Sequence, residues 1–394
     1  MTGLDTELDA GLEALRAAER YRVRRKVESR VGETARARVD GRDCIAFCSN
    51  DYLGLAQDPR VVEAFVNAAR HWGVGSGASH LVSGHTVEHH ALERELAEFV
   101  GRPRALLFST GYMANLAVAG ALLGRGDRVL EDRLNHASLI DGGLASGARF
   151  GRYAHGDVDA LRRRLGHAHR GRTLVASDGV FSMDGDAAPL PTLANACRDV
   201  RAVLMIDDAH GFGVNGGGGR GSVEAAGLGL DDVPVLMATL GKAIGTFGAF
   251  VAGSDALIET LVQRARTYIY TTALPPAVAA ATREALAIAR TEEWRRERLR
   301  DHVARFRAGA TALGLALMPS SSPIQPLAMG HEVAALSASE SLFEAGFWVP
   351  AIRPPTVPAG TSRLRITFSA AHSTSDVDGL LEALAVVAGR HARR

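Results

Sequence analysis

The 394-residue chain is short of lysine and cysteine, carries almost no net charge and has no long apolar run. A formal net charge of +1 creates no field that would attract a nucleic acid or a membrane surface. No apolar stretch reaches the roughly 18 residues of a membrane-spanning helix, and the polar start of the chain is unlike a signal peptide. We therefore expect a cytoplasmic protein that binds neither nucleic acid nor membrane.

The few cysteines argue against disulfides and against a metal centre. Cys44, Cys48 and Cys197 offer neither an even disulfide framework nor a metal-binding spacing. Histidines are more numerous, but His89 and His90 lie in a stretch of helical character and are interpreted as structural. We therefore expect no bound metal.

Lysine is the scarcest basic residue, since Lys26 and Lys242 are the only lysines among 45 Lys and Arg residues. Arginine can replace lysine at many solvated sites, but its guanidinium stays protonated and cannot form a Schiff base. Lys242 stands among small and apolar residues in Ala238–Gly245, which is typical of an amine that holds an aldehyde cofactor such as pyridoxal phosphate. A surface lysine that persisted by chance is the alternative interpretation. Lys26 lies in a run of arginines and fits a solvated face.

From about residue 100, short apolar segments alternate with segments of helical character. This alternation predicts an α/β fold with a mainly parallel sheet that helices cover on both faces. The expected strands are 105–108, 128–130, 173–176, 203–206, 235–237 and 248–251. Because ligands of such sheets bind beyond the carboxyl ends of the strands, the polar residues that follow them are candidate site residues.

The chain is long enough for two or three domains, and its pattern suggests two boundaries. We expect an N-terminal segment over residues 1–50, a large α/β domain over 51–272, and a smaller α+β domain over 273–394. Helical periodicity marks residues 4–30, and a strand is expected at 44–48. Further expected elements are helices at about 277–313, 333–345 and from 375 onward, and an extended loop at the prolines of 353–358.

An aspartate and two histidines follow expected strands. Asp207 comes directly after Val203–Ile206, and a carboxylate there can pair with a pyridinium nitrogen and keep it protonated. His210 is placed to bond the phenolic oxygen of the same ring, and His136 is placed to lie flat on it. The alternatives are a structural Asp–His pair, an incomplete metal site, and a purely structural His136.

A glycine turn follows the expected strand 105–108. Gly111 lets backbone N–H groups approach an anion there, and the dipole of the helix that follows favours phosphate. Many α/β turns contain glycine, so this signal is weak by itself. Two other glycine-containing segments are rejected as nucleotide-binding motifs. Gly73–Gly77 lacks the spacing of a dinucleotide fingerprint, and Gly241–Ala243 lacks the residue pattern of a P-loop.

Taken together, these residues resemble the α-oxoamine synthases, a family of fold-type I pyridoxal-phosphate enzymes. The likeness runs along nearly the whole chain, and its most specific motifs are Ser49–Leu55, Gly179–Gly185, Asp207–Gly211, Thr239–Lys242 and Ala351–Thr361. The resemblance implies a large domain with a mainly parallel seven-stranded sheet flanked by helices, a smaller C-terminal α+β domain and a short N-terminal helical segment. It also implies pyridoxal 5′-phosphate as the cofactor and a homodimer with a shared active site.

The resemblance implies a role for each matching residue. Lys242 would hold the cofactor covalently, Asp207 would pair with its ring nitrogen, and His210 would pair with its phenolic oxygen. His136 would stack on the ring, and these four residues form the expected catalytic set. The other expected cofactor contacts are Gly111, Tyr112, Ser182 and Thr239, together with Thr271 and Thr272, which would reach the phosphate of the partner subunit. The expected substrate contacts are Asn50 and Arg365 for the amino-acid carboxylate, Arg22 and Thr356 for the acyl group, and His136.

The stretch 351–361 is most similar to members that condense L-alanine with a pimeloyl thioester of coenzyme A or acyl-carrier protein in biotin biosynthesis. The resemblance thus implies an acyltransferase that releases CO2 and the free thiol carrier. Sister synthases that join glycine to acetyl-, succinyl- or long-chain acyl-CoA are the alternative within the family. A cofactor-binding protein without catalysis and an aminotransferase are the alternatives outside it. The segment Ser79-His80-Leu81 departs from the family pattern in a loop expected near the acyl chain.

Overall fold

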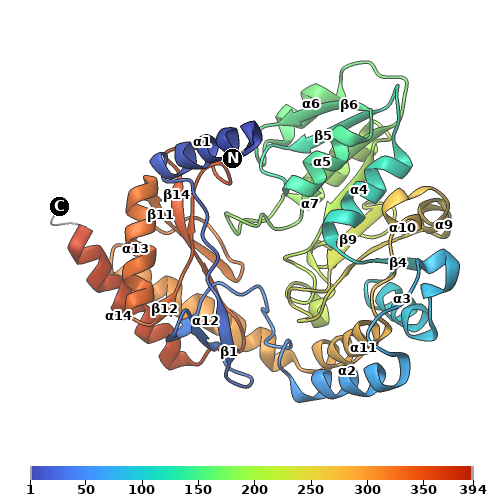
Figure 1. Ribbon diagram of the computed structural model, residues 1–394. Helices are drawn as coiled ribbons and strands as arrows, with labels where there is room; N and C mark the ends of the chain where they lie inside the picture. Colours follow the sequence, from blue (N-terminus) through green and yellow to red (C-terminus); the bar gives the residue numbers. More distant parts are fainter. Residues whose placement is uncertain (1, 392–394) are drawn as a thin grey trace. The chain divides into compact units, whose positions relative to one another are not determined.

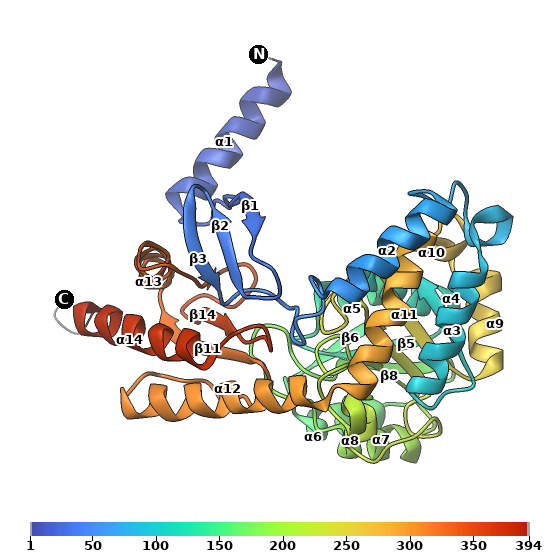
Figure 2. The ribbon, with the colours of Figure 1, turned by 90° about the horizontal axis from the view of Figure 1, so that it is seen from below.

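The computed structural model describes residues 2–391, which divide into two compact units. The larger unit comprises Asp51–Ser182 and Asp186–Glu297, and the smaller unit comprises residues 2–50, 183–185 and 298–391. Figures 1 and 2 show the helices and strands of both units. Among the described residues, no helix is both long and apolar enough to cross a membrane.

The larger unit is built around a seven-stranded sheet with the strand order β4-β10-β9-β8-β7-β5-β6. The strands from β9 to β6 run parallel to one another, and β10 is antiparallel to both β9 and β4. This confirms the expected mainly parallel sheet. Strand β6 was not expected from the sequence, because it is an edge strand with a single buried residue and no apolar run. The strands are β4 (Arg104–Phe108), β5 (Arg128–Asp132), β6 (Arg149–Tyr153), β7 (Thr173–Asp178), β8 (Val203–Asp207), β9 (Val235–Thr239) and β10 (Ala249–Gly253).

Alternate residues of the central strands enter two hydrophobic cores. Leu130 and Val175 belong to the core that contains residues of α6 and α7, whereas their neighbours Val129 and Leu174 belong to the core that contains residues of α4 and α9. This period of two is the geometry of a strand, and helices on both faces explain why every residue of β5, β7 and β10 is buried. The helices are α2 (Pro59–Trp72), α3 (Val87–Phe99), α4 (Gly111–Leu122), α5 (Ala137–Ala145), α6 (Val158–Leu165), α7 (Leu190–Asp199), α8 (Ser222–Ala225), α9 (Asp255–Arg264), α10 (Arg266–Ile269) and α11 (Pro276–Thr291), with short helices η1 (His80–Gly84) and η2 (Gly217–Gly219).

The boundary expected at residue 272 differs from the division found in the structure. Helix α11 packs along α2 and α3, so the larger unit continues to Glu297. The single helix expected over 277–313 is interrupted at Glu292, between α11 and α12 (Glu293–Ala312). Glu292 has φ −97° and ψ 74°, and its carboxylate accepts hydrogen bonds from Arg60 at 2.7 Å and from Arg295 at 2.8 Å. These contacts stabilise the break between α11 and α12, although the sequence there favours a continuous helix.

The smaller unit contains two sheets and several helices. One sheet has the order β1-β2-β3-β12, and the other has the antiparallel order β11-β14-β13. The strands are β1 (Val27–Arg30), β2 (Arg36–Val39), β3 (Arg42–Ala46), β11 (Ile324–Gly330), β12 (Phe347–Trp348), β13 (Ala351–Ile352) and β14 (Ser362–Thr367). The helices, besides most of α12, are α1 (Gly3–Ala17), α13 (Glu332–Glu344) and α14 (Thr374–His391). Residues 353–358 form the expected loop without helix or strand.

The first helix is shorter than the periodicity over residues 4–30 predicts. Helix α1 ends at Ala17, and Glu19 adopts a left-handed conformation with φ 55°. The chain then forms β1, which pairs with β2 in antiparallel register. In β1 the backbone hydrogen bonds to β2 replace the hydrogen bonds that a helix would make. The arginines of this segment provide no continuous apolar face that a helix could bury. Strand β3 begins and ends two residues before the expected strand at 44–48.

Candidate active site

A pocket with about 440 Å³ of empty space, including its open mouth, lies at the carboxyl ends of parallel strands in the larger unit. Strands β7, β8 and β9 end at Asp178, Asp207 and Thr239, and all three residues line the pocket. The other lining residues are Gly111, Tyr112, His136, Ser138, Ser182, Ala209, His210, Met237 and Lys242.

Lys242 lies in a tight turn between β9 and β10. Its partly buried Nζ donates a hydrogen bond to Thr239 Oγ1 at 3.2 Å. The turn is closed by the Gly245 N–H, which donates to the Lys242 carbonyl at 2.8 Å. Gly245 has φ 71°, and a Cβ there would lie 2.5 Å from the backbone nitrogen of Ala56, so the turn requires glycine. This packing holds the amine at the wall of the pocket.

Asp207 presents a buried carboxylate to the pocket, with only 4% of the residue exposed. Its Oδ2 accepts a hydrogen bond from Asn115 Nδ2 at 2.8 Å, and its Oδ1 accepts one from the Ala209 N–H at 3.0 Å. Both donors are neutral groups. They fix the orientation of the carboxylate and leave its charge for a cationic partner in the pocket.

His136 caps the N-terminus of α5 and faces the pocket. Its backbone N–H donates to Asp178 Oδ2 at 3.0 Å, and its Nδ1 accepts from the Ser138 N–H at 3.3 Å. Burial lowers the pKa of His136, although the nearby Asp207 carboxylate acts in the opposite direction. The imidazole is therefore mostly neutral at pH 7, and a neutral ring can stack on a cationic aromatic ring without charge repulsion.

His210 is held by Tyr52, a residue to which the sequence analysis assigned no role. The phenolic oxygen of Tyr52 lies 2.6 Å from His210 Nδ1, and both residues are buried. This hydrogen bond orients the imidazole of His210 toward the pocket that it lines. The position of Tyr52 within the motif Ser49–Leu55 is the sequence signal that could have suggested a functional role.

Replacing Tyr52 by phenylalanine is expected to lower both stability and activity. Loss of a partner of a buried polar group costs about 1–3 kcal/mol, and ~1.4 kcal/mol corresponds to tenfold in rate. We expect a lower melting temperature and a fall of about tenfold or more in kcat/KM. Tyr270→Phe is the matched control, because Tyr270 is 71% exposed. A Tyr52→Phe enzyme that matches this control in both measurements would contradict the role assigned to the hydrogen bond.

The start of α4 forms one wall of the pocket. A Cβ at Gly111 would lie 2.7 Å from Thr239 Cγ2, so a larger residue would not fit without a shift. Thr110 caps the helix by accepting a hydrogen bond from the Met113 N–H at 3.2 Å. The first N–H groups of a helix have no partner within it, and the helix dipole favours an anion there. This wall therefore suits a phosphate group.

Asp178 is a pocket residue that was not among the expected site residues. It is the neighbour of Asp207 in the register of β7 and β8. Burial, and next the charge of Asp207, raise the pKa of Asp178 well above its usual range. The uncharged form of Asp178 is therefore favoured beside Asp207. The rule that polar residues at strand ends mark the site would have found Asp178 as well.

His155 holds the segment that leads from β5 to His136. Its Nδ1 lies 3.0 Å from Asp132 Oδ1, and its Nε2 lies 2.9 Å from Asp186 Oδ2. Asp132 also accepts a hydrogen bond from the Leu134 N–H at 2.8 Å. Hydrogen bonds to the two carboxylates raise the pKa of His155 to about 10. The protonated imidazole thus ties two parts of the chain to the start of this segment.

The raised pKa of His155 predicts a pH-dependent contribution to stability. The folded-state pKa exceeds the unfolded value of about 6.5, so the contribution is complete below that pH and disappears as the pH rises toward 10. We expect His155→Gln to lower the free energy of unfolding by ~2–4 kcal/mol at pH 6 and by much less at pH 10. Urea unfolding at both pH values measures this, with His71→Gln as the control. An equal loss at both pH values would refute the charge argument.

The pocket unites residues that the sequence analysis selected from separate motifs. They are Gly111, Tyr112, His136, Ser182, Asp207, His210, Thr239 and Lys242. The exposed phenol of Tyr112 donates to Asp141. Thr271 and Thr272 do not line this pocket, and Thr272 pairs with Ser79 in an isolated β-bridge.

Four expected substrate contacts belong to the smaller unit, and two of them touch. Arg365 is 6% exposed and donates from both Nη1 and Nη2 to Asn50 Oδ1, at 3.3 Å in each case. Arg365 also donates to Thr367 Oγ1 at 3.0 Å. Asn50 and Thr367 are both neutral acceptors.

The other two contacts, Arg22 and Thr356, are exposed and lie in segments joined by a third residue. Arg353 donates to the Tyr21 carbonyl at 2.6 Å, directly before Arg22 in the chain. The carbonyl of Arg353 accepts from the Thr356 N–H at 3.1 Å. These bonds bring the N-terminal segment and the proline-rich loop together within the smaller unit.

The sequence matches the family model described as aminotransferase class I and II over residues 42–384. The chain therefore belongs to the class I and II aminotransferase family, in agreement with its sheet and its strand-end lysine.

Similar curated proteins carry the name of one particular enzyme. The 8-amino-7-oxononanoate synthase of Saccharophagus degradans is 61% identical over 98% of this chain and 97% of its own length. The protein of the same name from Methylococcus capsulatus is 64% identical over 95% of this chain and 97% of its own length. These relatives confirm the resemblance that the sequence motifs indicate.

Solved structures show the same fold. A serine palmitoyltransferase variant from S. paucimobilis with a bound PLP–myriocin adduct superposes with a TM-score of 0.93 at 31% identity, over 98% of each chain. The 8-amino-7-oxononanoate synthase of Francisella tularensis gives a TM-score of 0.78 at 32% identity, over 89% of this chain and 99% of its own.

Proposed function

We propose that this protein catalyses the decarboxylative condensation of L-alanine with a pimeloyl thioester to 8-amino-7-oxononanoate, CO2 and the free thiol carrier. Its cofactor is pyridoxal 5′-phosphate, and its pathway is biotin biosynthesis. Curated relatives at 59–64% identity over nearly the whole chain carry the name of this enzyme. The observation that carries the chemistry is the arrangement of Lys242, Asp207, His136 and His210 around one pocket.

The residues present fit pyridoxal phosphate. Lys242 supplies the amine for a covalent link, and Gly111 keeps a cradle at the helix N-terminus that a Cβ would fill. Asp207 supplies the buried anion that a protonated ring nitrogen needs, and the neutral imidazole of His136 can cover the ring face. His210 would hydrogen-bond the phenolic oxygen. The remaining contacts would come from Tyr112, Ser182 and Thr239.

When bound, the cofactor supplies an electron sink that stabilises negative charge at the substrate Cα. Lys242 Nζ would act as the base that takes the Cα proton of alanine and would later return a proton to the product. Thr239 Oγ1, 3.2 Å from Nζ, keeps the amine at this position. Asp207 would hold the proton on the ring nitrogen, and its bonds to Asn115 and Ala209 fix the orientation of the carboxylate.

Recognition of the two substrates is assigned to the residues of the smaller unit. Arg365, oriented by Asn50, would bind the carboxylate of alanine through its two terminal nitrogens. Arg22 and Thr356 would contact the acyl substrate, with Arg353 linking their two segments. The pimeloyl thioester could be carried by coenzyme A or by acyl-carrier protein.

The proposed assembly is a homodimer in which Thr271 and Thr272 serve the phosphate of the partner subunit. Their position outside this chain's own pocket is compatible with that role. The cytoplasmic location remains a prediction from the sequence.

Structural similarity alone does not choose between this reaction and serine palmitoyl transfer. The two structural relatives share 31% and 32% identity with this chain, and one fold can serve several acyl acceptors. The choice between the two reactions rests on the curated relatives. Their sequence identity to this chain is about twice that of the structural relatives, over nearly the full length.

Product identification by mass spectrometry tests the proposal. Purified protein with pyridoxal phosphate, L-alanine and pimeloyl-CoA is expected to release CO2, free thiol and a product with the mass of 8-amino-7-oxononanoate. Glycine and serine, each paired with acetyl-CoA and palmitoyl-CoA, serve as competing substrates. Faster thiol release with one of those pairs would replace the proposed substrates, and release of pyruvate without thiol would indicate an aminotransferase.

A further inference from the structure

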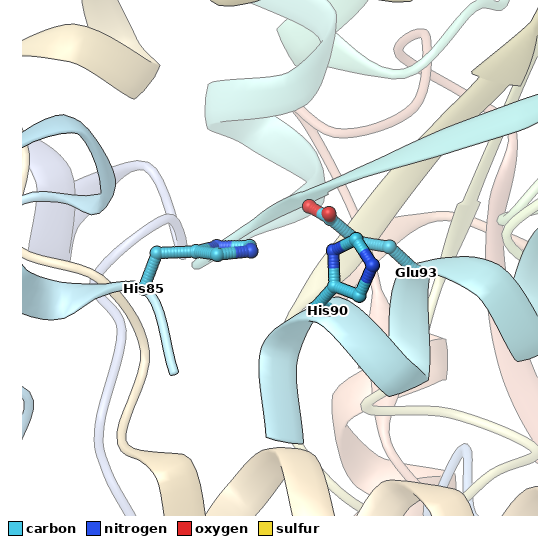
Figure 3. A group of neighbouring side chains, drawn as sticks. All are labelled: His85, His90 and Glu93. Atoms are coloured by element: carbon cyan, nitrogen blue, oxygen red, sulfur yellow. The ribbon is translucent and has the colours of Figure 1, made fainter. Parts of the chain in front are cut away.

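A second group of chemically active side chains lies outside the pocket, at the start of α3. His85, His90 and Glu93 each offer one ligand atom, and these atoms lie within 4.8 Å of one another. His90 and Glu93 are three residues apart on α3 and therefore share one face of the helix. Figure 3 shows the ring of His85, which precedes the helix, directed toward them. None of the three residues lines the pocket.

We infer that His85, His90 and Glu93 form a binding site for a divalent transition-metal ion, for which Zn²⁺ is the best-suited probe. Two imidazole nitrogens and one carboxylate oxygen are the ligand set of many zinc sites that keep a position open to water. Tetrahedral ligands at 2.0–2.1 Å from zinc lie about 3.4 Å apart, so separations of up to 4.8 Å must close by about 1.4 Å. His90 is exposed, and its side chain can make this movement.

His85 is oriented for metal binding by a neighbouring histidine. His85 Nδ1 lies 3.0 Å from His80 Nδ1, within hydrogen-bond distance, and Nε2 is the second nitrogen of the His85 ring. His80 is itself buried and stacked on Tyr268, with ring centroids 4.9 Å apart. His80 thus has the position of an outer partner that fixes a ligating imidazole.

His89 does not belong to the metal site, although it is adjacent in sequence to His90. Its Nδ1 accepts from the Thr86 N–H at 3.0 Å, and its Nε2 lies 2.7 Å from the Leu274 carbonyl. Both nitrogens are engaged, and the residue is fully buried. The sequence predicts a structural role for both His89 and His90. The hydrogen bonds of His89 agree with that role, whereas His90 lies close to Glu93.

Glu93 supplies the negative charge of the site. Its Oε1 accepts a hydrogen bond from the Leu107 N–H at 3.0 Å, which holds the carboxylate beside α3. A bound divalent cation would pair with this carboxylate. It would also join the segment of η1 to α3, next to the bridge between Ser79 and Thr272.

Metal binding can be measured on the full-length holoenzyme without substrates, so the outcome does not depend on the proposed function. Tag-free protein is stripped with EDTA, and Zn²⁺ is titrated by calorimetry and by equilibrium dialysis. Co²⁺ then serves as an optical probe of nitrogen and oxygen ligation. The variants are His90→Gln and Glu93→Gln, whose amides preserve size. His71→Gln is the matched control, because His71 is exposed on α2 outside the group.

The wild type and His71→Gln are expected to bind one Zn²⁺ with the same affinity. Each ligand variant should bind at least about 100-fold more weakly, since loss of even an outer-shell partner costs 10–100-fold. The Co²⁺ absorption should disappear in the same variants. Equal Zn²⁺ affinity in the wild type and His90→Gln would overturn the inference, as would absence of binding by the wild type. Retention of the pyridoxal-phosphate absorption in His90→Gln would show that the variant remains folded.

Discussion

Replacing Lys242 by alanine is expected to reduce turnover by at least about 10⁴-fold, because the covalent link and the base are lost together. The visible absorption of the purified enzyme should change at the same time, and borohydride should no longer attach the cofactor to the peptide that contains residue 242. Thiol release, absorption spectra and peptide mapping measure the three effects. Lys242→Arg should be as inactive as Lys242→Ala, since a guanidinium keeps the charge and cannot form the link.

The chain offers a matched control, because it has only one other lysine. Lys26 is exposed, with 76% of its side chain accessible, and its Nζ lies 3.4 Å from Glu28. Lys26→Ala should therefore keep full activity and full borohydride labelling at residue 242. Substantial turnover by Lys242→Ala, or labelling of Lys26 in the wild type, would refute the assignment.

Replacing Asp207 by asparagine is expected to lower kcat by about 10²–10³-fold, or ~2.7–4 kcal/mol, the usual cost of removing a preorganised electrostatic partner. An amide has nearly the same shape but no charge to keep the ring nitrogen protonated. The substitution should also weaken cofactor binding. Steady-state kinetics at saturating cofactor separates the loss in kcat from the loss in affinity.

Asp178→Asn is the informative comparison for Asp207→Asn. The two aspartates end neighbouring strands and line the same pocket. Burial and Asp207 raise the pKa of Asp178 and favour its uncharged form, so a neutral amide is a closer replacement there. We expect its kcat to fall by no more than about tenfold. Equal losses in the two variants would mean that the carboxylate charge of Asp207 is not the decisive property.

Much of the larger unit could be predicted from short apolar segments. Buried strands such as Thr173–Asp178 and Val203–Asp207 have nearly continuous apolar runs because helices cover both faces of the sheet. The site could be predicted in the same way, since Asp207 follows such a run. Lys242 could be selected from the sequence because the chain otherwise uses arginine almost throughout, and arginine could not replace lysine in a covalent link to a cofactor.

Other features could not be predicted because they depend on contacts between distant segments. The break at Glu292 is held by Arg60 and Arg295, and the helical pattern continues through it. Tyr52 acquires a role through a partner 158 residues away, His210. The expected helix up to residue 30 was not formed, because α1 ends at Ala17 and the last four residues of that range pair with β2 as strand β1.

The sequence by itself determined the fold class and the amine, because periodicity, strand-end polarity and the unique chemistry of lysine are local properties, and the resemblance of its motifs to a known family indicated the family of reactions. Only the tertiary structure decided which groups share a charge environment. It placed Asp178 beside Asp207 and so raised the pKa of Asp178, and it brought His85 close to His90 and Glu93. Burial and distance set these properties, and both arise only when separate segments pack together.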